Sequence, residues 1–133
     1  MAFIPMTEYD TSSDEVRAEY DDQISKHGRI TNMKRTLLQD VPSFKAYMEW
    51  YTLFDELVPV FGQRAMTIFS YAISTGNTCL ICGTFFRKIL IDAGEDPDNL
   101  VLNETEKKLL DFGVNICKNP HSIPNIPYSS PPP

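Results

Sequence analysis

Apolar side chains recur every three to four residues along most of this 133-residue chain. This spacing places them on one face of an α-helix. The broadest such face follows Pro42 and consists of Phe44, Tyr47, Met48, Tyr51, Phe54 and Leu57. Other elements must cover it, so we expect a core or subunit-interface role rather than a ligand role. No alternating strand pattern survives, and the sequence predicts an all-α fold of about six helices.

Capping signals and helix breakers set the expected boundaries of these helices. A Ser-x-x-Glu capping box begins at Ser12, Asn32 is expected to cap a short second helix, and Asn103 with Glu106 forms a second box. The segment 58–60 contains a proline and is expected to separate the third helix from the fourth. The predicted helices span about 13–26, 33–41, 42–58, 62–73, 79–94 and 103–118.

The length and composition of the chain suit a single globular domain. We predict an N-terminal arm over 1–12, a compact helical domain over 13–119 and an extended proline-rich C-terminal tail over 120–133. The net charge of -6 argues against nucleic acid or an anionic membrane as a partner. Neither a membrane-spanning segment nor a signal-peptide pattern is found, so we predict a cytoplasmic protein.

Two cysteines three residues apart, Cys79 and Cys82, open the fifth predicted helix. Asn77 or Thr78 is expected to cap this helix, with Cys79 in its first turn and Cys82 about one turn deeper. Thiols at this spacing can form a disulfide with little backbone movement, and a helix N-terminus stabilises a thiolate. The pair is therefore predicted to be redox-active rather than a structural disulfide.

Two other interpretations of the CxxC are less favoured. The cysteines could be small buried apolar residues, as unreactive cysteines often are. A structural zinc site needs four ligands, and the remaining candidates Cys117, His27 and His121 have no paired spacing. Cys117 is expected in the core of the last helix. We predict neither a metal nor a cofactor.

The context of the CxxC resembles a known family, the carboxymuconolactone decarboxylase and alkylhydroperoxidase D-like proteins. The resemblance covers about 24–123 and includes Pro42 leading an aromatic helix. Its motifs are HGRITNM, SYAISTGNTCLICGTFFRKILIDAG and NETEKKLLDFGVNICKNPHSI. It implies a compact helical domain that assembles into dimers, trimers or hexamers. Family members with a CxxC resemble antioxidant thiol enzymes, whereas the true lactone decarboxylases usually lack the pair.

The family's peroxidase site also has a proton relay that this sequence does not reproduce. The family has a glutamate twelve residues before the first cysteine and a histidine four after the second. Thr67 and Phe86 occupy these positions here, and neither titrates near neutral pH. Tyr71 and Arg87 are candidates to supply a hydrogen-bond donor and a positive charge instead.

The order in which the two thiols react has two opposing predictions. The helix terminus favours Cys79 as the more exposed and more acidic thiol. The resemblance implies that Cys82 attacks a peroxide and is oxidised to a sulfenic acid, which Cys79 resolves to a disulfide. Following the resemblance, we expect Cys82 to react with peroxide and Cys79 to be attacked by an external reductant.

The preferred hypothesis is an oligomeric thiol oxidoreductase of the alkylhydroperoxidase D-like type. It would reduce peroxides or disulfides by cycling Cys79 and Cys82 between dithiol and disulfide, with electrons from a reductant protein or a small-molecule thiol. One alternative is a carboxymuconolactone decarboxylase-like lyase that uses a cationic pocket without covalent thiol chemistry. Another is a noncatalytic redox sensor or oligomeric scaffold that has lost the proton relay.

Overall fold

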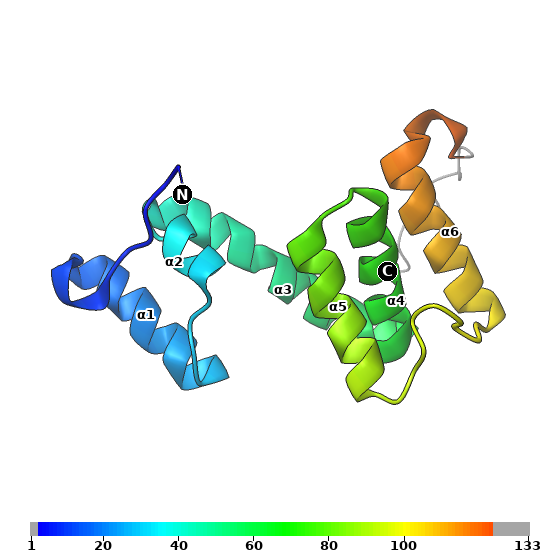
Figure 1. Cartoon of the computed structure of the whole chain (residues 1–133), viewed down its shortest axis with the longest axis horizontal. Coiled ribbons are helices and arrows are strands. Elements are labelled where there is room, and N and C mark those ends of the chain that lie inside the picture. Colours follow the sequence, from blue (N-terminus) through cyan, green and yellow to red (C-terminus); the bar gives the residue numbers. More distant parts are fainter. Residues whose placement is uncertain (1–2, 124–133) are drawn as a thin grey trace, which may run out of the picture. The chain divides into compact units, whose positions relative to one another are not determined.

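The computed structural model describes residues 3–123, which form six α-helices, two short 3-10 helices and no strand (Figure 1). The α-helices are α1 (Asp14–His27), α2 (Asn32–Leu37), α3 (Val41–Phe61), α4 (Gln63–Gly76), α5 (Leu80–Asp92) and α6 (Glu104–Lys118). The 3-10 helices are η1 (Tyr9–Thr11) and η2 (Pro120–Ser122). The predicted all-α fold is confirmed. The tail beyond residue 123 lies outside the described residues.

Contacts within the chain divide it into two compact units, 1–55 and 56–133, with the boundary inside α3. The predicted domain over 13–119 includes parts of both units. No glycine or proline marks this boundary, because it falls between Asp55 and Glu56 within a continuous helix. The single-domain organisation therefore stays a prediction.

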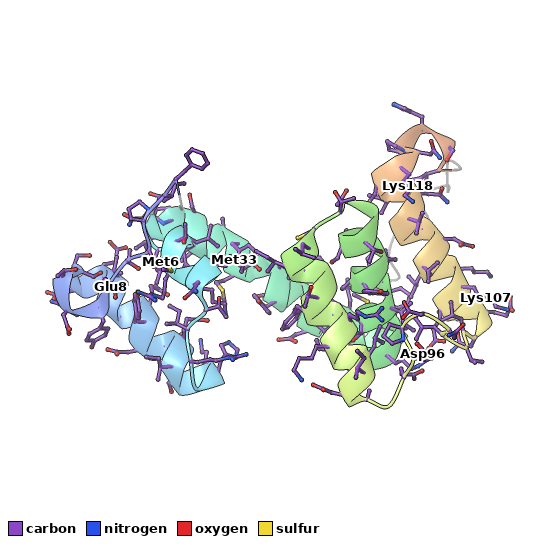
Figure 2. The ribbon with its side chains drawn as sticks, viewed as in Figure 1. Met6, Glu8, Met33, Asp96, Lys107 and Lys118 are labelled. Carbon is purple, nitrogen blue, oxygen red and sulfur yellow. The ribbon has the colours of Figure 1, made fainter. Side chains whose placement is uncertain are left out.

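The first unit packs α1, α2 and the beginning of α3 around a small core of Tyr20, Leu38, Val41 and Phe44. The N-terminal arm lies against these helices. The Thr7 backbone N–H donates to the Arg35 carbonyl at 3.1 Å, and Gln39 donates to the Pro5 carbonyl at 2.9 Å. Glu8, labelled in Figure 2, pairs with Arg35. The described part of the arm is thus bound to its own unit.

The second unit has α4 at its centre, with α5 and α6 packed against it (Figure 1). The fully buried apolar side chains of α4 include Met66 and Ile68, because this helix contacts neighbours on both sides. Gly113 allows close approach of α6, since a Cβ there would lie 3.2 Å from the Phe69 ring. Phe69 stacks on Phe112, with ring centroids 6.1 Å apart.

Close packing continues to the C-terminal end of α4. A Cβ at Gly76 would lie 3.1 Å from the Cβ of Cys117, so this position accommodates only glycine without displacement. The Cys117 thiol donates to the Ile73 carbonyl at 3.6 Å and is half-buried, whereas the sequence predicted a core residue. This contact fixes the end of α4 from which the chain enters the CxxC segment.

Several helix ends differ from the predicted ones. Ser13, not Ser12, caps α1, and its hydroxyl accepts the Val16 N–H at 3.4 Å. Ser12 instead donates to the Glu8 carbonyl at 2.6 Å, so the predicted capping box is wrong. Thr31, not Asn32, caps α2. In both cases an adjacent residue with an equally suitable hydroxyl takes the cap, a choice that spacing alone does not resolve.

The predicted break at 58–60 is also wrong, because α3 continues through Pro59 to Phe61. A proline within a helix costs one hydrogen bond and crowds the carbonyl four residues earlier, but here only two helical residues follow it. The helix ends instead before Gly62, which has a φ of 88°. Residues with a Cβ rarely adopt this backbone conformation. The capping box of Asn103 and Glu106 at the start of α6 is confirmed.

No helix among residues 3–123 is both long enough and apolar enough to cross a membrane.

Candidate active site

The CxxC lies at the junction of α4 and α5, in the second unit. Only Asn77, Thr78 and Cys79 separate the two helices. The Cys79 N–H donates to the Ser74 carbonyl at 2.9 Å and the Thr78 N–H to the Thr75 carbonyl at 3.1 Å, so the junction is tied to the last turn of α4. Thr78 adopts a φ of 54°, the one positive value at a non-glycine residue among those described. This left-handed residue reverses the chain direction into α5.

Cys79 itself is the N-cap of α5, which corrects the predicted cap at Asn77 or Thr78. Its sulfur accepts the Cys82 backbone N–H at 3.3 Å, the bond that a serine or aspartate oxygen usually makes at this position. Cys79 therefore precedes the first turn instead of lying in it, and Cys82 occupies the third helical position. The helix begins one residue later than predicted because Thr78 adopts a left-handed backbone conformation.

The two sulfurs lie 2.7 Å apart, and both cysteines are free thiols. This separation is longer than a disulfide bond of about 2.05 Å but within the range that small side-chain rotations close. The Cys79 thiol donates to the Cys82 sulfur in this contact. The structure thus brings together the two cysteines that the sequence singled out.

The two thiols differ in acidity because they occupy opposite ends of this contact. The side-chain contact with Cys82, followed by the Cys82 and Ile81 backbone N–H groups, lowers the pKa of Cys79. The same side-chain contact, with burial and the neighbouring negative charge, raises the pKa of Cys82. Of the two thiols, Cys79 is therefore the more acidic and Cys82 the less acidic.

The four candidate relay residues have hydrogen-bond or ring partners away from the sulfurs. Buried Thr67 donates its hydroxyl to the Gln63 carbonyl at 2.9 Å, within its own helix. Phe86 packs edge-to-face on Phe85, with centroids 5.1 Å apart. Tyr71 and Arg87 lie together, the guanidinium donating to the Tyr71 hydroxyl at 3.3 Å. Their role as a relay stays a prediction.

Arg87 is held by a residue that the sequence analysis did not consider. Asp98 accepts two hydrogen bonds from the Arg87 guanidinium, at 2.9 and 2.6 Å, and this contact raises the pKa of Arg87 further above its usual value. The loop carrying Asp98 is folded by Asp96, labelled in Figure 2, which accepts the Asp98 N–H at 3.0 Å. The sequence Asp96-Pro97-Asp98-Asn99 is typical of a turn, and this was the signal from which the loop could have been predicted.

A cleft of about 600 Å³ lies elsewhere, in the first unit. Its lining is Glu19, Asp22, Gln23, Lys26, His27, Phe44, Lys45, Met48, Glu49, Tyr51, Thr52 and Asp55. None of the candidate site residues takes part in it. Within residues 3–123, no group of three or more histidine, cysteine or acidic side chains is arranged to hold a metal ion.

Comparisons of the chain with protein-family models, with curated proteins and with solved structures found no match. The resemblance to the carboxymuconolactone decarboxylase and alkylhydroperoxidase D-like family therefore stays a prediction.

Proposed function

We propose that this protein is a thiol-dependent oxidoreductase of the alkylhydroperoxidase D-like type, with an antioxidant role. It reduces peroxides or disulfides by cycling Cys79 and Cys82 between dithiol and disulfide. The observation that carries the proposal is the 2.7 Å approach of the two free sulfurs at the N-terminus of α5. Such proximity makes disulfide formation an intramolecular step, and the helix end favours the thiolate that starts it.

The chemistry of the cycle requires only the two thiols and an external reductant. With a hydroperoxide, one thiolate attacks the terminal oxygen, the O–O bond breaks and an alcohol leaves. The second thiol then displaces water from the sulfenic acid and forms the Cys79–Cys82 disulfide. A reductant protein or a small-molecule dithiol returns the pair to the reduced state by thiol–disulfide exchange.

The surface beside Cys79 favours substrates with an apolar group. Leu80 and Ile81 follow it directly and are 82% and 68% exposed, and Phe85 is exposed one turn further along α5. Organic hydroperoxides and disulfides flanked by apolar groups match this surface better than hydrogen peroxide does, because they bury apolar area when they bind.

Homo-oligomerisation belongs to the same proposal, and the exposed apolar residues support it. Beyond those of α5, the second unit exposes Val60 and Phe61 at the end of α3. Apolar side chains of this size commonly mark protein interfaces when they form a patch. Size-exclusion chromatography with light scattering tests this part: a dimer, trimer or hexamer is expected, and a monomer at micromolar concentration contradicts it.

The lyase alternative receives less support from the charges in this unit. A decarboxylase acting on a lactone needs a free positive charge for the substrate carboxylate. Arg87 is committed to Asp98, and Arg64 is committed to Glu95 and Glu106. Neither arginine is available without breaking an ion pair.

Stopped-flow oxidation of the reduced protein by cumene hydroperoxide, with thiol counting, tests the proposal. The reference protein carries Cys117→Ser, so that the thiol count includes only Cys79 and Cys82. We expect rapid loss of two thiols per chain, recovery with dithiothreitol, and repeated turnover when dithiothreitol is in excess. The matched control replaces all three cysteines with serine and should consume no peroxide above background.

The outcomes separate the three hypotheses. Oxidation no faster than that of free cysteine contradicts the proposal. Reversible disulfide formation without turnover indicates the redox sensor, and lactone consumption by the control without cysteines indicates the lyase.

A further inference from the structure

Lys34 of α2 is a buried lysine, and within residues 3–123 its ammonium group has no ion pair with a carboxylate. The residue is only 6% exposed. Its Nζ donates to the Gln23 side-chain carbonyl at 2.5 Å and lies 5.1 Å from the centroid of the Tyr51 ring. Lysines are almost never buried without a carboxylate partner, because the ammonium ion loses its hydration. The surroundings of Lys34 thus favour the neutral amine, which is a nucleophile.

The two side chains that contact this amine belong to the cleft of the first unit. Gln23 and Tyr51 both line it, and its volume of about 600 Å³ suits a small organic ligand. Gln23 separates the amine from the cleft and is itself 2% exposed. The amide nitrogen of Gln23 donates to Asp22 at 3.5 Å, a distance at the limit of a hydrogen bond. Rotation of this weakly held side chain therefore opens a path from the cleft to Lys34.

The charged side chains of the cleft select the kind of ligand. Both lysines in its lining are paired within the cleft, Lys26 with Asp22 at 2.9 Å and Lys45 with Glu19 at 3.3 Å. The lining also contains Glu49 and Asp55, which form no ion pair among the described residues, so its net charge is negative. The apolar part of the lining is Phe44, Met48 and the Tyr51 ring. An uncharged or cationic molecule with an apolar body matches this lining, and an anionic one does not.

We propose that Lys34 is a reactive amine that forms an imine with a small uncharged or cationic aldehyde or ketone bound in this cleft. The site lies in the first unit and makes no use of the CxxC. It is a second chemical activity of the chain, independent of the thiol cycle.

The reaction is a condensation and needs no oxidant or reductant. The nitrogen lone pair of Lys34 attacks the carbonyl carbon and a C–N bond forms. The carbonyl oxygen takes a proton from the nitrogen, which gives a carbinolamine. The hydroxyl group then leaves as water, and the C=N bond of the imine remains. Burial supports the first step, because desolvation lowers the pKa of the Lys34 ammonium group.

Reductive trapping in the wild-type protein tests the proposal. The protein is incubated with benzaldehyde and cyanoborohydride at neutral pH, and mass spectrometry locates the benzyl groups. Cleavage after acidic residues places Lys26 and Lys34 in the peptide 23–40 and Lys45 in the peptide 41–49, and fragmentation assigns the label. Lys26 and Lys45 are internal controls, because they belong to the same cleft and their side chains are 63% and 59% exposed.

The expected result is the reverse of the order of exposure. We expect at least about tenfold more adduct on Lys34 than on either control lysine, since each unit by which an ammonium pKa falls raises the neutral fraction about tenfold. A yield on Lys34 that does not exceed the yield on both Lys26 and Lys45 overturns the proposal.

Two neighbouring residues of α3 test whether the aldehyde enters through the cleft. Thr52 lines the cleft, whereas Leu53 is exposed outside its lining. Thr52→Trp should slow the labelling of Lys34 by narrowing the cleft, and the matched control Leu53→Trp should leave it unchanged. Equal labelling rates in the two variants overturn this route. Far-UV circular dichroism confirms that both variants are folded.

The charge of the ligand is tested with 4-formylbenzoate, which adds a carboxylate to benzaldehyde. Each labelling rate of Lys34 is divided by the rate of the same aldehyde with N-acetyl-lysine. We expect a lower ratio for 4-formylbenzoate, because the lining of the cleft is negatively charged. An equal or higher ratio overturns the assigned ligand class. These experiments are also run on the variant without cysteines, so their outcome is distinct from that of the peroxide assay.

Discussion

The ion-pair cluster around Glu106 offers a sharp test of what holds the second unit together. Glu106 is 4% exposed. Its carboxylate accepts the Asn103 backbone N–H at 2.9 Å, and its backbone N–H donates to the Asn103 side chain at 2.9 Å. It also pairs with Arg64. Arg64 binds Glu95 through two hydrogen bonds of 2.6 and 3.1 Å, so the cluster joins α4, α6 and the loop between α5 and α6.

The expected cost of Glu106→Ala follows from these contacts. Losing one half of the capping box costs about 1 kcal/mol. Losing a charge-assisted hydrogen bond costs about 1.5 kcal/mol, at the lower end of its range because the Arg64 side chain is 36% exposed and keeps Glu95. The free energy of unfolding should therefore fall by about 2.5 kcal/mol. Glu106→Gln keeps an acceptor for the Asn103 N–H and should cost only about 1 kcal/mol.

The dependence on pH gives an independent check with a defined sign. Arg64 lowers the pKa of both Glu95 and Glu106. A carboxyl group whose pKa is lower in the folded state contributes stability above its unfolded pKa of about 4.3. That contribution is lost as the pH falls through the folded pKa. The difference between the wild type and Glu106→Gln should therefore shrink below about pH 4.

Urea denaturation followed by far-UV circular dichroism measures the change, and amide hydrogen exchange of α6 localises it to the second unit. The matched control is Glu104→Gln, an exposed glutamate of the same helix paired with Lys107, which should cost less than about 0.5 kcal/mol. Lys107 is labelled at the start of α6 in Figure 2. If Glu106→Ala costs no more than Glu104→Gln, the cluster does not stabilise the fold as argued.

Two further predictions concern the CxxC surroundings. Thr78→Gly should stabilise the protein by about 0.5–1 kcal/mol in urea denaturation, because glycine adopts a positive φ without the cost that threonine carries. The control Thr84→Gly lies within α5. It should destabilise the protein by a few tenths of a kcal/mol, on the order of the difference in helix propensity between threonine and glycine. Equal losses of stability in both variants would refute the backbone strain at position 78. Arg87→Ala should change the rate of Cys79 with dithiodipyridine by less than about threefold, since Asp98 already neutralises the guanidinium. A tenfold lower rate, absent in Asp98→Asn, would place Arg87 in the chemistry.

Local signals in the sequence determined most of the helices. A capping box closes its hydrogen bonds within four residues, so Asn103 and Glu106 specify the start of α6 without reference to the rest of the chain. Gly94, expected at the end of the fifth helix, takes a φ of 82° just after the last residues of α5. The CxxC spacing likewise brought the two sulfurs together, because the third residue after an N-cap faces it.

Neighbouring residues of similar chemistry limited how precisely the helix boundaries could be predicted from the sequence. Ser12 and Ser13, or Thr31 and Asn32, can each cap a helix, and only the backbone conformation selects one. Pro59 was expected to break α3, but a proline this near a helix end is tolerated when a glycine completes the turn. The division of contacts inside α3 also had no signal in the sequence.

The sequence by itself determined that this chain is helical and that Cys79 and Cys82 are paired, because both depend on spacing along one helix. Only the tertiary structure decided that the Cys79 sulfur, and not Asn77 or Thr78, caps α5. That choice depends on the left-handed Thr78, held where the end of α4 meets α5. The partners of Arg64 and Arg87 were likewise decided by packing, because Glu95 and Asp98 lie 31 and 11 residues away along the chain. Contacts at such separations arise from the packing of helices, which residue spacing does not encode.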